Sequence, residues 1–223
     1  MKQIPLAIAP QPARSFENFV AGANTAVLDH LAHLQPGSPP VYLWGPAGSG
    51  KTHVLQATAL HLQGQGGRVG WFGAADAMYW DDAGGWALVV FDDCDRWDAD
   101  RQQAAFALFV EATGDGVPIV AAGRVPPVDL PLRDDLRSRF GWGHVFALQP
   151  LAEPEVRAAL RREADRRGVF LSDEVMDYLL TRFARDLKHL MAQLDRLDAF
   201  ALANKRAITV PLLKQMLVDE GGG

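Results

Sequence analysis

The sequence has very little cysteine, because Cys94 is the only one among its 223 residues. A single thiol excludes an internal disulfide, and low cysteine usage is typical of proteins that work in a reducing compartment. The sequence also lacks an apolar run of the roughly 20 residues that a membrane-spanning helix requires. Its first residues, MKQIP, contain no apolar core of a signal peptide. We therefore expect a cytoplasmic protein with no membrane partner.

An excess of basic charge is also missing. The chain has 22 lysines and arginines against 27 aspartates and glutamates, which gives a formal net charge of −5. This balance argues against a general nucleic-acid-binding surface, although a local basic patch is compatible with it. We expect DNA contact to be weak or indirect at most. The hydrophobic content of 48% is typical of a soluble globular protein.

Apolar segments and turn residues divide the sequence into three parts. Residues 1–13 contain three prolines and no helical period, which predicts an extended tail. In residues 14–150, helical segments alternate with short apolar runs, and this pattern predicts an α/β fold with a parallel, doubly wound sheet. The expected strands are 41–44, 68–72, 86–91, 117–122 and 144–148. Residues 151–223 have apolar residues at helical spacing, which predicts a small all-helical domain.

Two kinds of residue are expected to shape helix ends. Asn24 precedes a helical apolar period that extends to residue 34, and an Asn at this place is a typical N-cap. Asp95 and Asp98 follow the third expected strand, and we expect them to be surface or helix-capping residues.

The segment 45–52 carries the strongest chemical signal in the chain. It reads Gly45-Pro46-Ala47-Gly48-Ser49-Gly50-Lys51-Thr52 and fits the pattern G-x-x-x-x-G-K-S/T at every position. Such a loop, between a strand and a helix N-terminus, directs backbone N–H groups at phosphate oxygens. We expect Lys51 to contact the β- and γ-phosphates and Thr52 to ligate Mg²⁺. The alternative is a glycine-rich turn without a ligand, but the flanking strand and helix favour a nucleotide, either ADP or ATP.

A pair of acids follows the third expected strand. Asp92 and Asp93 come directly after the apolar run 86–91, so they should lie at the carboxyl edge of the sheet, where ligands of such sheets bind. We expect Asp92 to hold Mg²⁺ and Asp93 to orient an attacking water. Alone, the pair is equally compatible with a solvated strand end; after a complete phosphate loop, a functional role is favoured.

Four segments together resemble one protein family. Segments 16–24 and 45–53 resemble the opening segment and the nucleotide loop of the AAA+ domain of the bacterial replication initiator DnaA. Segment 137–143 resembles its S-R-F-x-W-G element, and 185–187 resembles its sensor-II motif. The resemblance covers about residues 14–220. It implies an AAA+ nucleotide-binding domain followed by a helical lid, with nucleotide between them and His53 among the residues around it.

The resemblance also implies roles for two arginines. Arg139 matches the arginine that reaches the γ-phosphate of a neighbouring AAA+ subunit, where its planar fork stabilises developing charge. The alternative is an ion pair with Asp134 or Asp135, for which other arginines are better placed. Arg185 matches the sensor-II arginine, which contacts nucleotide phosphates from the lid. Its alternative is an ion pair with an acid on its own helix.

One position departs from the family pattern. The family normally places a polar sensor-I residue after the fourth strand, whereas this chain reads AAGRVPP over residues 121–127. No Asn, Thr or Asp occurs in that turn. We therefore expect nucleotide binding to be intact and intrinsic ATP hydrolysis to be weak.

Within this family the chain resembles Hda, the short DnaA homologues that promote inactivation of ATP-bound DnaA on the sliding clamp. DnaA itself adds an N-terminal domain and a helix-turn-helix domain, and neither is expected here. The tail residues Gln3, Ile4, Leu6 and Ile8 resemble a clamp-binding peptide, in which Gln-apolar-x-Leu-x-apolar places anchors in an apolar groove. The resemblance implies the sliding clamp of DNA polymerase III and DnaA as partners and a negative regulator of replication initiation as the function. It leaves self-association open.

Two other functions are compatible with a phosphate loop and a helical lid. One is an autonomous ATPase that loads a helicase, as the DnaC family does. The other is a DNA-binding initiator fragment, against which the net charge and the missing helix-turn-helix argue. The clamp-like tail favours the regulator, because a loader has no need of it.

Overall fold

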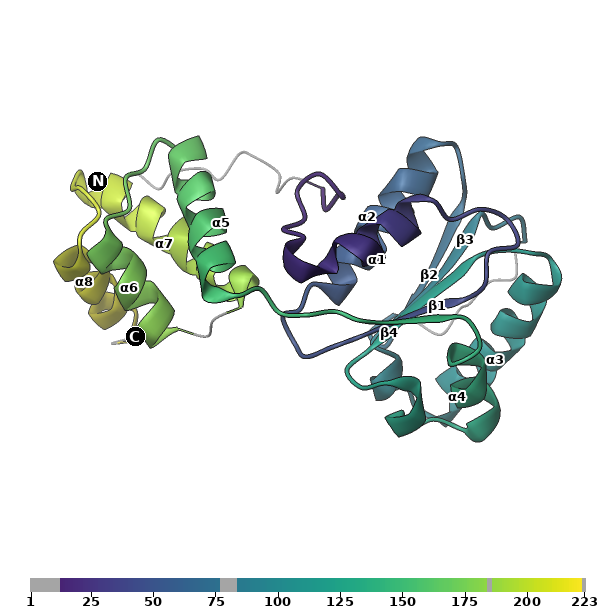
Figure 1. Ribbon diagram of the computed structural model, residues 1–223. Helices are drawn as coiled ribbons and strands as arrows, with labels where there is room; N and C mark the ends of the chain where they lie inside the picture. The colour runs from purple at the N-terminus through teal and green to yellow at the C-terminus, as the bar shows by residue number, and fades with distance from the viewer. Residues whose placement is uncertain (1–12, 77–83, 184–185, 222–223) are drawn as a thin grey trace. The chain divides into compact units, whose positions relative to one another are not determined.

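The computed structural model describes residues 13–76, 84–183 and 186–221 (Figure 1). The chain divides after Pro150 into two compact units, one of which comprises Ala13–Pro150 and the other the segment from Leu151 onward. In the part of the chain that is described, no helix has the length and apolarity needed to cross a membrane.

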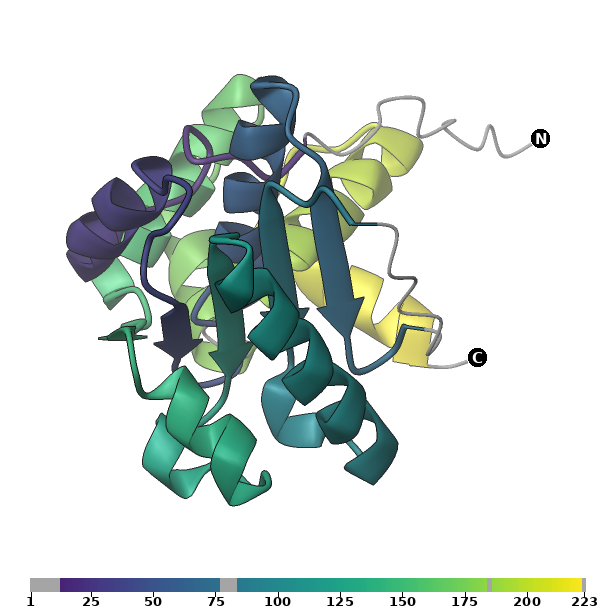
Figure 2. The same cartoon turned by 90° about the vertical axis from the view of Figure 1, so that its right-hand side faces the viewer.

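The unit Ala13–Pro150 is built on a parallel five-stranded sheet, which confirms the predicted α/β fold. Its strands lie in the order β2-β3-β4-β1-β5 (Figure 2). They are β1 (Val41–Trp44), β2 (Val69–Gly73), β3 (Leu88–Asp92), β4 (Ile119–Gly123) and β5 (His144–Ala147). The register pairs Trp44 with Gly123, so the carboxyl ends of β1 and β4 meet at one edge of the sheet. Ligands of such sheets bind at this edge.

Helices cover both faces of this sheet (Figure 1). Helices α1 (Thr25–Ala32) and α2 (Lys51–Gly64) lie on one face, and α3 (Ala99–Gly114) and α4 (Asp134–Phe140) lie on the other. Successive strand residues therefore enter different cores. Leu43 packs in the cluster that contains residues of α1 and α2, whereas Tyr42 packs with residues of α3 and α4. Burial on both faces explains why the central strands read as continuous apolar runs.

Asn24 precedes α1 as expected, but its side chain does not cap the helix. Instead, the side-chain amide donates to the carbonyl oxygen of Gln149 at 2.9 Å and accepts from the Gln149 backbone N–H at 2.8 Å. The expected capping bond was therefore wrong. A buried amide gains more from two partners across the fold than from one exposed helix N–H, and Asn24 thereby ties α1 to the end of the first unit.

The second unit is all-helical. It consists of α5 (Glu153–Arg166), α6 (Asp173–Arg182), α7 (Leu187–Asn204) and α8 (Val210–Gly221). Leu160, Leu179, Leu194 and Met216, one from each helix, lie in one fully buried core. Ser172 caps α6 by accepting a hydrogen bond from the Val175 backbone N–H.

Candidate functional site

The phosphate-loop sequence connects the carboxyl end of β1 to the N-terminus of α2. Two of its glycines have no room for a side chain. A Cβ at Gly50, where φ is +96°, would lie 2.7 Å from Cε2 of Phe19. A Cβ at Gly45 would lie 2.6 Å from the carbonyl oxygen of Leu148. The loop conformation therefore depends on glycine at both positions.

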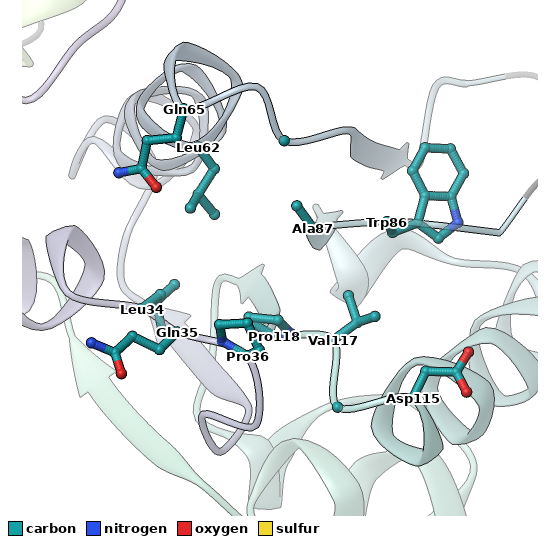
Figure 3. Close-up of a pocket in the computed structure, with 12 residues that line it drawn as sticks. Leu34, Gln35, Pro36, Leu62, Gln65, Trp86, Ala87, Asp115, Val117 and Pro118 are labelled. Carbon is teal, nitrogen blue, oxygen red and sulfur yellow. The ribbon is translucent and has the colours of Figure 1, made fainter.

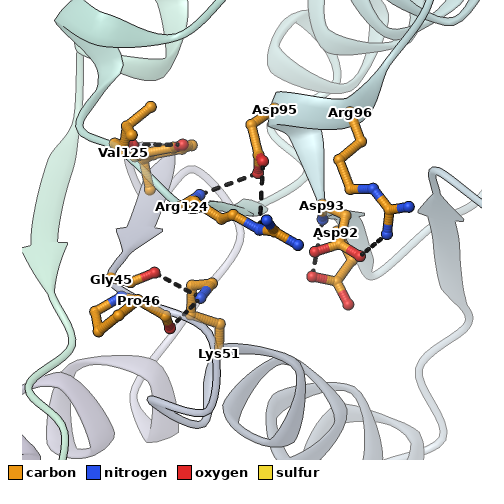
Figure 4. A network of polar contacts seen from close by, with 10 residues as sticks. Gly45, Pro46, Lys51, Asp92, Asp93, Asp95, Arg96, Arg124 and Val125 are labelled. Carbon is orange, nitrogen blue, oxygen red and sulfur yellow. Dashed lines mark hydrogen bonds and ion pairs between the residues drawn. The ribbon is translucent and has the colours of Figure 1, made fainter.

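Lys51 is the first residue of α2, and its side chain folds back over the loop (Figure 4). Its Nζ atom donates to the carbonyl oxygens of Gly45 at 2.7 Å and Pro46 at 2.9 Å. Burial lowers the pKa of the ammonium, against the opposing effect of nearby carboxylates. Among the described residues, the hydrogen bonds of the Lys51 ammonium go to neutral carbonyls alone. An anionic ligand would stabilise this buried cation, because charged partners make the stronger hydrogen bonds.

The loop also contains an unsatisfied polar atom. The Ser49 hydroxyl is buried and has no hydrogen-bond partner among the described residues. Buried hydroxyls in native structures are normally paired. A phosphate group offers several acceptor oxygens. It could accept hydrogen bonds from the Ser49 hydroxyl, from Lys51 and from the backbone N–H groups at the N-terminus of α2.

The expected metal ligands lie together. The Thr52 hydroxyl donates to Oδ2 of Asp92 at 2.9 Å, which joins the start of α2 to the end of β3. Asp92 is 7% exposed, and burial raises the pKa of its carboxyl. A hydroxyl and a carboxylate at this spacing fit Mg²⁺, which is usually held by a few protein oxygens together with phosphate oxygens and water.

The Asp92 carboxylate makes a testable contribution to stability. Because its pKa is raised on folding, ionised Asp92 destabilises the folded chain as pH rises through that pKa. Asn in place of Asp92 removes the charge, keeps an oxygen for the Asp93 N–H and offers an amide N–H to the Thr52 hydroxyl, which can accept as well as donate. We expect Asp92→Asn to raise the melting temperature of the nucleotide-free chain at pH 7, by about 2–4 °C for each kcal/mol gained, and to weaken Mg²⁺-dependent nucleotide binding. Thermal melts from pH 4 to pH 8 measure the first effect; a lower melting temperature at pH 7 would contradict it.

Asp93, the expected water-orienting residue, lies beside this pair. It has the left-handed backbone φ of +51°, which is uncommon for a residue other than glycine and is often found at functional sites. Its backbone N–H donates to Oδ1 of Asp92 at 2.9 Å, and its carboxylate lies 3.7 Å from Nη1 of Arg96 (Figure 4). Its action on water stays a prediction.

His53 lies in the first turn of α2, where its side chain binds the segment of residues 15–19 beside the phosphate loop. Its Nε2 atom lies 3.1 Å from the carbonyl oxygen of Ser15 and 3.0 Å from Oδ1 of Asn18. Since both partners are acceptors, Nε2 carries the proton. Burial lowers the pKa of the ring, which keeps it neutral. The imidazole also meets Phe19 edge-on, so its contacts position the segment that covers Gly50.

Arg139 lies on α4, which packs on the face of the sheet opposite to α2. Its side chain is surrounded by aromatic rings. Its guanidinium carbon is 4.9 Å from the ring centre of Phe106 and 4.7 Å from that of Trp142. The alternative ion pairs with Asp134 and Asp135 are made by other arginines: Arg137 binds Asp134, and Arg133 binds Asp135, each at 2.7 Å. Within the described residues, Arg139 forms no salt bridge.

Several expected site residues cannot be placed. The clamp-like residues Gln3, Ile4, Leu6 and Ile8 and the sensor-II residue Arg185 lie outside the described residues.

A separate pocket of about 370 Å³ opens at the opposite edge of the sheet (Figure 3). It is lined by residues that precede β3 and β4, among them Trp86, Ala87, Val117 and Pro118. It therefore lies at the amino ends of the strands, away from the phosphate loop. This pocket and the loop are different features of the unit.

Two family models match the chain. A model described as Hda, lid domain, matches residues 153–217, and one described as RNA helicase matches residues 41–114, which include the phosphate loop and Asp92. An uncharacterized protein of Haemophilus influenzae is 32% identical over 231 residues, covering 97% of this chain and 98% of that protein. The chain belongs to the Hda family of DnaA-related AAA+ proteins.

Solved structures agree with the fold of this Hda-family chain. Domain III of the replication initiation protein DnaA of Thermotoga maritima has a TM-score of 0.78 at 24% identity, with 95% of this chain and 98% of that one covered. DnaA of Aquifex aeolicus, in a structure bound to AMPPCP, has a TM-score of 0.71 at 22% identity, with 84% of this chain and 66% of that one covered. The chain therefore has an AAA+ nucleotide-binding fold.

One contact at the candidate site, between Asp95 and Arg124, was not predicted from the sequence. Asp95 was expected at the surface or at a helix cap, but its side chain is 12% exposed and accepts a hydrogen bond from the Arg124 backbone N–H at 3.0 Å. Asp98, in contrast, caps α3 as expected. The Asp95–Arg124 contact joins the segments after β3 and β4, and only the sheet order brings them together.

Proposed function

We propose that this chain is a negative regulator of replication initiation, which binds ADP or ATP with Mg²⁺, is tethered to the sliding clamp and stimulates ATP hydrolysis by DnaA. The phosphate loop, the unpaired Ser49 hydroxyl and the Thr52–Asp92 contact support nucleotide binding. The chain's own hydrolysis is weak, because the turn after β4 has no Asn, Thr or Asp that could hold an attacking water.

Arg139 carries the proposal that hydrolysis occurs in a partner. Arg139 has no salt bridge in the described part of the chain. The neighbouring arginines are paired: Arg137 binds Asp134, and Arg133 binds Asp135. Trp142 is exposed and Phe106 is half-buried. Cation–π contacts near the surface are worth about 0.5–1 kcal/mol, so they orient the guanidinium and still allow it to move. A planar fork of this kind in trans stabilises charge on a transferring phosphoryl group. DnaA with bound ATP is the proposed partner, because the AAA+ fold of this chain is that of DnaA domain III.

The tail supports the proposed clamp tether. We expect a peptide of residues 1–10 to bind the bacterial sliding clamp, since Gln3 offers an amide and Leu6 and Ile8 offer apolar anchors. Replacing both Gln3 and Leu6 with alanine should abolish clamp binding by the whole protein in surface plasmon resonance. Gln11→Ala, in the same tail but outside the motif, is the matched control and should bind as wild type does. Unchanged binding by the double variant would refute the tether.

A pull-down from cell extract separates this proposal from the loader. Wild-type protein should retain the clamp and DnaA, and a variant without residues 1–8 should lose the clamp. A helicase loader of the DnaC type would retain the replicative helicase instead, and the tail deletion would not matter. That result would refute the regulator.

A further inference from the structure

A tryptophan, Trp142, follows Arg139 by three positions and lies just beyond the end of α4. Its exposed fraction is 62%. We propose that Trp142 is a positioning residue, whose ring holds the guanidinium of Arg139 ready for the nucleotide on a partner and thereby raises the rate of stimulated hydrolysis. This inference rests on the proposed trans role of Arg139.

The backbone brings Trp142 back beside Arg139. The N–H of Gly141 donates to the carbonyl oxygen of Ser138 at 3.0 Å, and the N–H of Trp142 donates to that of Arg139 at 3.1 Å. Such bonds between residues three apart tighten the last turn of a helix, and in this geometry side chains three positions apart lie one above the other. The end of α4 therefore places the indole and the guanidinium on the same side.

The backbone after Trp142 is also fixed. A Cβ at Gly143 would lie 1.9 Å from the carbonyl oxygen of Pro40, so only glycine fits there. The N–H of His144, the first residue of β5, donates to the same carbonyl oxygen at 2.9 Å. Trp142 thus lies between two anchored segments, and its place does not depend on its contact with Arg139.

Three aromatic rings surround the guanidinium of Arg139. Its central carbon is 4.7 Å from the ring centre of Trp142, 4.9 Å from that of Phe106 and 5.8 Å from that of Phe109. Cations within about 6 Å of a ring centre are attracted by the ring face, and tryptophan attracts them most strongly. Phe109 is fully buried, and Phe106 packs against the same core. Trp142 is the exposed member of the group, so it can be replaced without opening that core.

An aromatic ring suits this task better than a carboxylate does. A carboxylate would neutralise the guanidinium and occupy its N–H donors, and a phosphate would have to displace it. A ring face attracts the cation and leaves its five N–H donors and its charge available. The two acids at the start of α4 are bound by other arginines, so the contacts of Arg139 keep its hydrogen-bonding groups free for a ligand.

Orientation before the reaction affects the rate more than it affects association. A long arginine side chain loses much rotamer freedom when it is ordered at a transition state, and a ring that orders it beforehand lowers that cost. Because Trp142 acts through Arg139, its loss should lower the maximal rate of stimulated hydrolysis. The concentration of the chain that gives half of this maximum should stay the same.

The first test measures phosphate release from ATP-bound DnaA, with clamp and DNA present, over a range of concentrations of the full chain. Trp142→Leu keeps an apolar side chain but has no ring, and it should lower the maximal rate about two- to fivefold, as loss of one exposed cation–π contact predicts. Trp142→Phe restores a ring face and should recover most of the rate. Neither variant should change the half-saturating concentration.

Val128→Ala is the matched control. Val128 is 76% exposed on η3 (Pro127–Asp129), which packs beside α4, so this variant also removes exposed apolar surface near Arg139. It takes away no ring and should leave the maximal rate unchanged. Thermal melts establish that each variant is folded.

A second test needs no partner. The NMR signal of the Arg139 Nε–H group, assigned by its absence in Arg139→Ala, should be displaced by the currents of the nearby rings. In Trp142→Leu this signal should move toward the position of a free arginine, and in Trp142→Phe it should move less.

A wild-type maximal rate in folded Trp142→Leu, or an Nε–H signal that does not move, would overturn the inference. So would a higher half-saturating concentration at an unchanged maximal rate, because Trp142 would then be a contact with the partner. Each of these results leaves the role of Arg139 in place. A wild-type chain that does not stimulate DnaA, or stimulation retained by Arg139→Ala, would refute the trans role itself, and the inference with it.

Discussion

Lys51→Ala is expected to abolish nucleotide binding, with ADP and ATP affinities reduced by at least about 100-fold. Charge-assisted hydrogen bonds are roughly twice as strong as neutral ones, and Lys51 is a buried cation at the mouth of the loop. Its removal also leaves the carbonyl oxygens of Gly45 and Pro46 facing the incoming phosphates. Repulsion by these oxygens adds to the loss. Calorimetry or a fluorescent nucleotide analogue measures the change.

The control for this variant is Lys214→Ala. Lys214 lies on α8, where its ammonium is 5.7 Å from the ring centre of Tyr178, far in sequence from the loop. Lys214→Ala removes one positive charge, as Lys51→Ala does, and should leave nucleotide affinity unchanged. If Lys51→Ala retained ADP and ATP within about threefold of wild type, the loop at 45–52 would not be the phosphate site.

Arg139→Ala is expected to remove the stimulation of DnaA altogether. A trans-acting arginine is worth about 10³–10⁵ in the rate of phosphoryl transfer, so the rate of ATP hydrolysis on DnaA should fall to its unstimulated value. Arg139→Lys should restore little, because an ammonium lacks the planar fork. The rate of phosphate release from ATP-bound DnaA, with clamp and DNA present, measures both variants.

The fold should survive this change. Arg139 contributes contacts with Phe106 and Trp142 but no salt bridge within the described residues. Its loss should therefore cost about 0.5–1 kcal/mol of stability, and clamp binding should be unaffected. Arg137→Ala is the matched control, since that residue is paired with Asp134 on the same helix and should leave stimulation intact. Retained stimulation by Arg139→Ala would exclude the trans role.

The sequence predicted the strands and the loop because these features are local. The segment 41–52 carries its own apolar run, its own glycines and the start of its own helix, and each agrees with the structure. Asn24 was interpreted wrongly because its partner, Gln149, is 125 residues away. Local spacing cannot indicate which of two possible partners a buried amide will take.

The Asp95–Arg124 contact shows the same limit within the site. From the sequence, the turn after β4 could be described only by the absence of Asn, Thr and Asp. Its neighbour in the sheet is β1, so Arg124 lies beside the phosphate loop, and Asp95 reaches it from the segment after β3. Arg124 stands in the turn where the family has a polar sensor-I residue. What Arg124 contacts there depends on strand order and register, which are properties of the folded sheet.

The central claim is that the hydrolysis that matters takes place on DnaA and uses an arginine from this chain. The most direct measurement follows radiolabelled ATP held by DnaA, after mixing with this chain preloaded with unlabelled AMPPCP and bound to clamp on DNA. We predict that label on DnaA is converted to ADP with wild type and with Arg137→Ala, and is retained with Arg139→Ala. Conversion of the label with Arg139→Ala, or no conversion with wild type, would contradict the claim.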